Sequence, residues 1–341
     1  MKKSKIRHEE PLEKVKRIIE KEGSEGWNLA KQTLQDQETH SPQLKEAINY
    51  VTQLPDFFRP TVVSICCSAV GGNPKTTVSC SASLILLSKA IGIHDDIIDN
   101  LKVRNNRPTF FGKFGKEIAL ILSDVLLFKG FTLIRRNFEI GVPQQSIIEI
   151  LETINCVWFE QAESEVLELR SRKQIDISPK KCLTKIIMRA SEFEAVTRIG
   201  GILGGGSKKE IEVLGSYGRL LGTSSLLRDE LIDMLEFDTL RRRIRNESLP
   251  LPLVYALQNT RFRSEIVSLI SKHKLSRNDL RRISITSDKA EGLEYVAERI
   301  AKMTKKASSH IKIFKNRELL ELLCTSLRIN REEWQQTIYS K

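Results

Sequence analysis

Long stretches of the chain place apolar residues three and four positions apart, which is the spacing of one face of an α-helix. Two clear examples cover residues 144–170 and 208–237. No stretch of the sequence alternates apolar and polar residues with the period of two expected of a half-buried strand. Short segments rich in glycine, proline and asparagine separate the helical stretches, as at Gly71 to Pro74 and at Gly204 to Ser207. This pattern predicts an all-α fold.

The composition supports one large helical domain. Among 341 residues there are only 18 glycines and 10 prolines, and aromatic residues make up 6%, which disfavours a turn-rich sandwich or barrel. The breaks are as short as loops inside a compact domain, and no repeat of 20–50 residues is visible. We therefore predict a single domain over residues 26–341, preceded by a helical extension over residues 1–25 that frays.

The sequence also predicts a soluble, cytoplasmic protein. No uninterrupted apolar run reaches the roughly 18 residues that a membrane-spanning helix needs. The basic N-terminus continues into acidic residues rather than the apolar core of a signal peptide. The six cysteines form no CxxC pair and lack histidines at zinc-ligand spacing, so we expect reduced thiols in the core. They are Cys66, Cys67, Cys80, Cys156, Cys182 and Cys324.

The charge of the chain predicts an anionic partner. The net charge is +12, and residues 261–341 hold 18 basic against 10 acidic side chains. Nucleic acid, an acidic membrane surface and a phosphorylated small substrate all fit this charge. The sequence lacks zinc-finger and RNP motifs and has few aromatic residues for base stacking, so we do not expect nucleic acid. A transient contact of the basic C-terminal region with an anionic membrane surface remains a hypothesis.

Two acidic clusters interrupt strongly apolar helical stretches. The pattern DDxxD supplies Asp95, Asp96 and Asp99, and RDELIDM repeats the arrangement with Asp229, Glu230 and Asp233. At 100° per residue, positions 95 and 99 lie about 40° apart on one helix face. A single cluster is equally well explained as a solvent-facing stripe, but two clusters on core-type helices favour cation binding.

Magnesium suits such clusters because it takes oxygen ligands and commonly binds through one or two carboxylates together with substrate phosphates. If the two clusters face each other across a cavity, they form a clamp for Mg²⁺ and a diphosphate. The ion then stabilises the charge that develops on a departing diphosphate.

The ordered series of motifs resembles the trans-isoprenyl diphosphate synthase (polyprenyl synthetase) family from about residue 55 to residue 258. The resemblance implies an all-α, isoprenoid-synthase-type helical bundle around a central cavity, and a homodimer. It also implies Mg²⁺ held by Asp95, Asp99 and Asp229, with Asp96, Glu230 and Asp233 in support. The matching motifs are Arg59-Pro60, HDDIIDN at 94–100, Arg104, Pro108-Thr109, Phe114-Gly115, Asp124, Gln161 in FEQAE, SEFEAVTRIGG at 191–201, RDELID at 228–233 and SLPLPLVYAL at 248–257.

The resemblance further implies two diphosphate sites, which the sequence retains unequally. On the allylic side Arg104 and Gln161 match the family. The usual Lys-Thr pair falls on Met188-Arg189, so Arg189 or Lys185 is expected to substitute.

On the isopentenyl diphosphate side, Arg59 remains, but three expected contacts are replaced, by Asp56, Ser88 and Asn105. We expect the nearby Lys89 to be an exposed charge rather than a replacement.

These features predict a Mg²⁺-dependent prenyltransferase that ionises an allylic prenyl diphosphate and condenses it with isopentenyl diphosphate. One alternative is cyclisation, hydrolysis or transfer to another acceptor without isopentenyl diphosphate, and another is a noncatalytic regulatory subunit. Product chain length is not encoded in these motifs. Leu84, Leu87 and Ile91 are candidates either for a prenyl channel or for core packing. The run from Arg241 to Arg245 either steers diphosphate or forms a solvated face neutralised by nearby acids.

Overall fold

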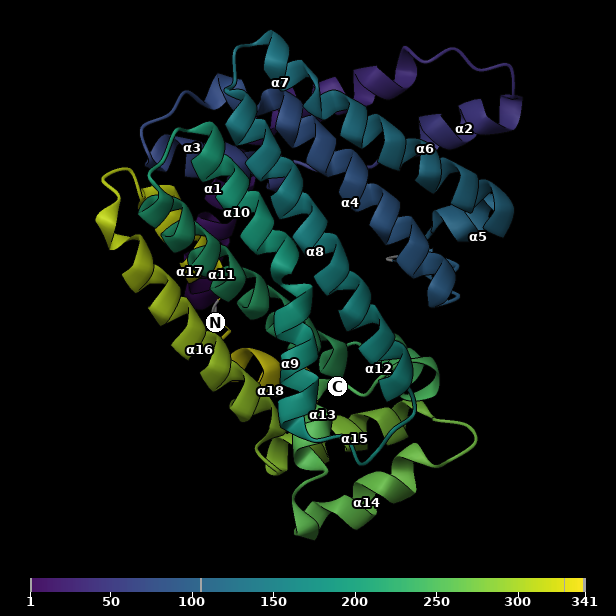
Figure 1. The fold of residues 1–341 in the computed structure, drawn as a ribbon. Helices are drawn as coiled ribbons and strands as arrows, with labels where there is room; N and C mark the ends of the chain where they lie inside the picture. The colour runs from purple at the N-terminus through teal and green to yellow at the C-terminus, as the bar shows by residue number, and fades with distance from the viewer. Residues whose placement is uncertain (1, 105, 328, 340–341) are drawn as a thin grey trace. The chain divides into compact units, whose positions relative to one another are not determined.

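The computed structural model describes residues 2–104, 106–327 and 329–339, and they are helical almost throughout (Figure 1). The predicted all-α class is confirmed. The elements in order are α1 (Lys2–Gln35), α2 (Pro42–Val51), α3 (Phe58–Ala69), η1 (Pro74–Thr77), α4 (Val78–Ile98), β1 (Val103–Arg104), β2 (Arg107–Pro108), α5 (Phe110–Phe114), α6 (Lys116–Ile134), α7 (Arg136–Glu139), α8 (Gln144–Ser171), α9 (Pro179–Arg189), α10 (Ser191–Leu203), α11 (Lys208–Leu235), α12 (Phe237–Asn246), α13 (Leu251–Ala256), α14 (Thr260–Ile270), α15 (Arg277–Lys289), α16 (Gly292–His310), η2 (Ile311–Ile313), α17 (Glu318–Ser326) and α18 (Arg331–Tyr339).

Helices begin where the sequence supplies capping side chains. Ser178 accepts a hydrogen bond from the Lys181 amide at the start of α9, and Pro179 follows in the first turn, where a missing amide hydrogen has no cost. Ser276 and Asp279 form a capping box at the start of α15. The breaks that the sequence marks therefore become short loops between helices.

Contacts within the chain divide it into two compact units. Unit 1 comprises Met1–Thr153, Val196–Glu212 and Phe314–Asn316, and unit 2 comprises Ile154–Ala195, Val213–Ile313 and Arg317–Lys341. Helix α1 continues through residue 25, where the sequence predicted a boundary. The single domain over residues 26–341 stays a prediction.

The core of unit 1 is built around α4, which lies beside α6 (Figure 1) and also packs against α1 and α3. Fully buried residues of this core include Ile85 and Leu86 on α4 and Leu122 and Leu126 on α6. The segment Pro74–Ile98 is long and apolar enough to cross a membrane by length and composition, although 67% of its apolar 18-residue window is buried inside the protein. Scattered serines and one lysine interrupt this segment, so it contains no uninterrupted apolar run of 18 residues.

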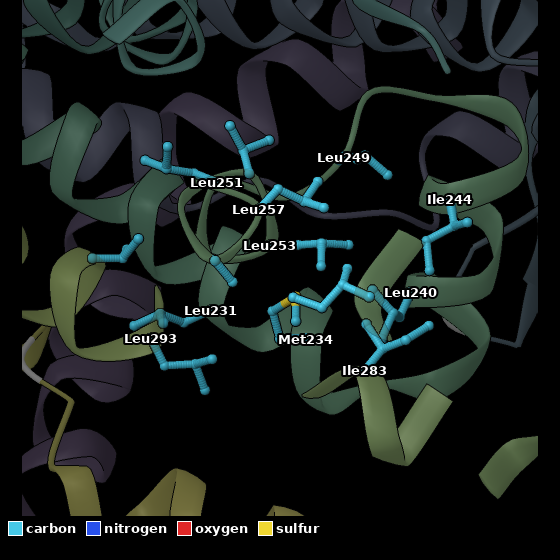
Figure 2. Packing of buried hydrophobic residues seen from close by; sticks show 14 of the residues in the cluster. Leu231, Met234, Leu240, Ile244, Leu249, Leu251, Leu253, Leu257, Ile283 and Leu293 are labelled. Atoms are coloured by element: carbon cyan, nitrogen blue, oxygen red, sulfur yellow. The ribbon is translucent and has the colours of Figure 1, made fainter. Parts of the chain in front are cut away.

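The core of unit 2 gathers leucines from α11, α12, α13 and α15 (Figure 2). Leu231 and Met234 come from α11, and Leu253 and Leu257 come from α13 and the residue after it. Each is fully or almost fully buried. Burying one such side chain contributes about 1.5–3 kcal/mol, so this cluster fixes the helix that carries the second acidic motif.

The cysteines follow the prediction with one exception. All six are free, and five are buried, whereas Cys156 on α8 is exposed. Burial raises the pKa of the Cys80 thiol and the Cys182 thiol to about 12. The expectation of core thiols is therefore wrong for Cys156, which is exposed.

Two glycines of unit 1 give a matched test of packing. A Cβ on Gly23 of α1 would lie 2.2 Å from the Phe57 carbonyl oxygen, whereas a Cβ on Gly92 of α4 meets no atom within 4 Å. We expect Gly23→Ala to lower the free energy of unfolding by about 1–3 kcal/mol through overpacking. Gly92→Ala should raise it by up to about 1 kcal/mol through better helix propensity. Urea denaturation checks both, and equal effects would contradict the close approach of α1 to residue 57.

Candidate active site

The first acidic cluster lies where α4 ends. Asp95 and Asp96 are in the last turn, and Asp99 is the C-cap residue, whose amide donates to the Asp95 carbonyl at 2.8 Å. The chain leaves the helix after this point because Asn100 adopts a left-handed φ of 52°. Asp95 and Asp99 are half-buried and Asp96 is buried. The structure thus places the two predicted metal ligands of this motif one turn apart.

Arg104 contacts this cluster directly. A short antiparallel pairing of β1 with β2, in which Arg104 lies opposite Arg107, follows the end of α4. The Arg104 Nη2 donates to Asp96 Oδ1 at 2.7 Å, while 58% of the arginine side chain remains exposed. A guanidinium has five N–H donors, so this pair leaves donors for an external anion. Asn105, where the family has a second arginine, lies outside the described residues.

The second acidic cluster lies on α11 in unit 2, and its first carboxylate differs from the other two. Asp229 is exposed. Surrounding protein atoms raise its pKa above the usual value, whereas Arg228 and Arg189 act to lower it. Arg189, the last residue of α9, is also exposed. Arg189, a predicted diphosphate ligand, is therefore close enough to Asp229 for its positive charge to act on that carboxylate.

Glu230 and Asp233 are held by a half-buried arginine. Arg243 of α12 donates to Glu230 Oε1 at 3.0 Å through Nη2 and to Asp233 Oδ2 through Nη1. Glu230 Oε2 also accepts the Leu251 amide at 2.6 Å. Burial raises the pKa of Asp233 to about 6, against the opposing effect of Arg243. These contacts suit the supporting role that the sequence predicts for Glu230 and Asp233.

The partners of Arg243 were not found from sequence. The sequence offered Glu236 and Asp238 as neutralising neighbours for the arginine run, and Arg241 does pair with Asp238 at 2.6 Å. Arg243 instead pairs with the acidic motif ten and thirteen residues earlier, and the turn between α11 and α12 makes this contact possible. Helical spacing alone cannot report such a contact.

Lys185 and Gln161 organise the surroundings of Arg189. Lys185 is 4% exposed, forms an ion pair with Glu168 and donates to Ser248 Oγ at 2.9 Å. This pairing supports a structural role for Lys185, so that of the two expected substitutes only Arg189 is exposed. Gln161 Nε2 donates to the Arg189 carbonyl at 2.7 Å and to Ser191 Oγ at 3.1 Å. Gln161 thus fixes the backbone that carries Arg189.

A cavity of about 920 Å³ in unit 1 contains the residues of the predicted second anion site. Asp56 and Arg59 line it, and their side chains form an ion pair of 2.5 Å. Asp56 Oδ1 also accepts the Phe58 amide at 3.2 Å at the start of α3. The carboxylate that replaces a lysine of the family therefore has a local structural function as a helix cap.

Lys89 also lines this cavity. It is half-buried, and its Nζ donates to the Leu54 carbonyl at 2.6 Å. The expectation that Lys89 is an exposed charge is therefore wrong, because α4 turns this residue toward α1 and the segment before α3.

The apolar candidates behind Asp95 belong at least partly to the core. Leu84 and Leu87 are buried, and Ile91 is half-buried. A Cβ on Gly130 of α6 would lie 2.7 Å from Leu87 Cδ2, so Leu87 packs directly against α6. This contact favours the core-packing interpretation for Leu87.

The carboxylates fit magnesium by their chemistry. Among the residues that the structure describes, no group of three His, Cys, Asp or Glu side chains gathers closely enough to hold an ion alone. Mg²⁺ retains several waters and needs only one or two carboxylates when substrate phosphates complete its coordination. The half-buried oxygen donors of Asp95 and Asp99 and the exposed donor of Asp229 satisfy that requirement.

Comparison with known proteins identifies the class. The family model for polyprenyl synthetase matches residues 41–284, and the chain belongs to this family. The fold agrees: a structure of geranylgeranyl pyrophosphate synthetase from Pyrococcus horikoshii superposes with a TM-score of 0.84 at 22% identity, covering 94% of this chain and 99% of the other. A polyprenyl synthase from Caulobacter crescentus, complexed with calcium and isoprenyl diphosphate, superposes with a TM-score of 0.77 at 20% identity over 92% and 97% of the two chains.

Particular relatives match over shorter stretches of the chain. A short chain isoprenyl diphosphate synthase from Methanothermobacter thermautotrophicus is 28% identical over 178 residues, which are 52% of this chain and 54% of the relative. An octaprenyl diphosphate synthase from Escherichia coli is 27% identical over 208 residues, covering 59% and 62%. The chain thus spans somewhat more than half the length of the curated relatives that it matches.

The buried pair of Lys185 and Glu168 yields a stability prediction. Lys185→Met should lower the free energy of unfolding by about 3–5 kcal/mol, because it leaves a buried carboxylate without its cation. Interactions with Lys185, Ser248 and Arg243 lower the pKa of Glu168 to about 2 although burial opposes this. The stabilisation is therefore complete above the ordinary glutamate pKa and is lost as the pH falls toward 2.

Urea denaturation of Lys185→Met and of the double variant with Glu168→Gln measures this effect. The double variant should recover part of the loss, and Lys302→Met, which removes an exposed pair with Glu298, should change little. A loss for Lys185→Met that is no greater than that of Lys302→Met would contradict the structural role.

Proposed function

We propose that this protein is a Mg²⁺-dependent prenyltransferase that ionises an allylic prenyl diphosphate and condenses it with isopentenyl diphosphate. The observation that carries the proposal is that each acidic motif is associated with an arginine. Arg104 pairs with Asp96 at 2.7 Å, and Arg189 lies near enough to Asp229 to lower its pKa. Carboxylates beside arginines that retain exposure are suited to hold a metal ion and a diphosphate together.

Asp95 and Asp99 of unit 1 would be ligands for Mg²⁺, as would Asp229 of unit 2, and the bound ion would neutralise negative charge on the departing diphosphate. Arg104 and Arg189 would bind diphosphate oxygens through charge-assisted hydrogen bonds. Gln161 would position Arg189 through its carbonyl, while Arg243 would fix Glu230 and Asp233 behind Asp229. These residues would bind and orient the leaving group so that the carbon–oxygen bond breaks at a site arranged for the resulting charge.

We also propose a homodimer. Helix α6 exposes several large apolar side chains, including Phe128 at 76% and Ile121 at 56%. Exposed apolar surface of this kind commonly marks a protein interface. We also propose a cytoplasmic location. The excess of basic residues in the C-terminal region supports a further proposal, that this region makes a transient contact with an anionic membrane surface.

Product analysis tests the reaction. Purified protein with Mg²⁺ is incubated with allylic diphosphates of ten, fifteen or twenty carbons, each with and without isopentenyl diphosphate. We expect longer diphosphates only when isopentenyl diphosphate is present. Hydrocarbons or alcohols formed without it would instead support cyclisation or hydrolysis. The carboxylate of Asp56 favours this alternative, because a negative charge in the second anion site opposes binding of isopentenyl diphosphate. Absence of turnover in every mixture would favour a noncatalytic regulatory subunit.

Two substitutions test the metal ligands. Asp95→Ala and Asp229→Ala should each lower Mg²⁺-dependent turnover by at least about 100-fold. Removing a group that only supports a metal ligand costs about 10–100-fold in activity, and removing the ligand itself should cost more. Circular dichroism should show an intact fold, since each change removes a charge from an acidic cluster. Asp238→Ala is a matched control, because Asp238 is an exposed carboxylate whose ion pair, with Arg241, lies outside the acidic motif. Unchanged turnover in either ligand variant would contradict the metal role.

A further inference from the structure

The cavity of unit 1 is lined by more cations than carboxylates. Lys16 comes from α1, Arg59 from α3, Lys89 from α4 and Arg104 from β1. The carboxylates on its lining are Glu20 and Asp56. Charges that converge from four elements around one hollow favour an anionic ligand. Asp56 lowers the positive charge that the cavity offers to a ligand, because it pairs with Arg59.

Lys89 is placed to compensate for that pairing. Its ammonium lies 5.1 Å from the centre of the Trp27 ring and donates one hydrogen bond, to the Leu54 carbonyl at 2.6 Å. An ammonium has three N–H donors, so a ligand in the cavity can accept from those that Leu54 does not use. The cation–π contact with Trp27 and the hydrogen bond to the Leu54 carbonyl hold the long Lys89 side chain in one orientation. Less side-chain entropy is then lost when a ligand binds.

We propose that Lys89 is an anchoring residue for the diphosphate of isopentenyl diphosphate in this cavity, and that Asp56 weakens the binding by competing for Arg59. The inference rests on the proposed function and deepens it, because it assigns the cation for a site where the family's lysine is replaced by a carboxylate. In this arrangement the diphosphate displaces Asp56 as the partner of Arg59 and accepts hydrogen bonds from Lys89.

The protonation of Lys89 makes this binding sensitive to pH. Burial lowers the pKa of Lys89 to about 8, Asp56 acts to raise it, and Arg59 acts to lower it. Lys89 therefore carries its charge at neutral pH and loses it as the pH rises above 8. The other charged groups on the cavity lining are Lys16, Glu20, Asp56, Arg59 and Arg104. The loss of charge on Lys89 should lower the affinity as the pH rises through this pKa.

Calorimetric titration with isopentenyl diphosphate, without allylic substrate, tests the proposal on the full chain at pH 7 and pH 9. We expect Lys89→Met to raise the dissociation constant at least 10-fold at pH 7 while keeping an unbranched side chain on Trp27. Lys89→Arg should retain binding and remove the weakening at pH 9. Asp56→Asn, which keeps a capping oxygen but removes the charge, should tighten binding several-fold.

Lys113→Met is the matched control. Lys113 also stacks on an aromatic ring, 4.5 Å from the centre of Tyr50, but it does not line the cavity. It should leave the dissociation constant unchanged. Equal affinity of wild type and Lys89→Met would overturn the proposal, as would weaker binding in Asp56→Asn with an unchanged urea midpoint.

The titration separates this inference from the proposed reaction. It measures binding without turnover, so a protein that binds isopentenyl diphosphate through Lys89 but makes no longer product would contradict only the proposed reaction. Elongation with the same Michaelis constant for isopentenyl diphosphate in wild type and Lys89→Met would contradict only the role of Lys89.

Discussion

Carboxylates that lie close together on a helix repel one another, and the spacing of the helix keeps them close. In this protein guanidinium groups offset the repulsion. Arg104 pairs with Asp96 at the end of α4, and Arg243 pairs with Glu230 and Asp233. This pairing neutralises the supporting carboxylates Asp96, Glu230 and Asp233, while Asp95, Asp99 and Asp229 are the carboxylates for which we propose the metal role. Each motif therefore combines charges that stabilise the fold with charges suited to binding.

The same division of labour applies to the cations. Lys185 is buried, Arg243 is half-buried, and both are paired with carboxylates, whereas Arg104 and Arg189 remain exposed. A buried pair contributes little net free energy but is costly to break, so it fixes the arrangement of helices around it. Exposed arginines keep the donors that an anion requires. The exposure of a cation therefore bears more on anion binding than the number of cations in the sequence.

Sequence was a good guide where the determining interactions are local. Helical periodicity predicted α8 and α11, and the apolar run before Asp95 predicted α4, because each pattern lies within one element. Lys89 was misjudged because its partner, the Leu54 carbonyl, lies 35 residues away in the chain. The partners of Arg243 were missed because they lie on the preceding helix, across a turn that helical spacing does not describe. Asp56 read as a lost cation, yet its contact with the Phe58 amide also makes it a cap for α3.

The contrast among the thiols makes the protein convenient to label. Cys156 is exposed on α8, while the remaining five cysteines are buried, and burial raises the pKa of Cys66, Cys67, Cys80 and Cys182. Since alkylating reagents attack the thiolate of an accessible cysteine, a maleimide dye should attach at one defined point of the native chain. Fluorescence from that position would report substrate-linked rearrangement of α8 without any cysteine having to be removed first.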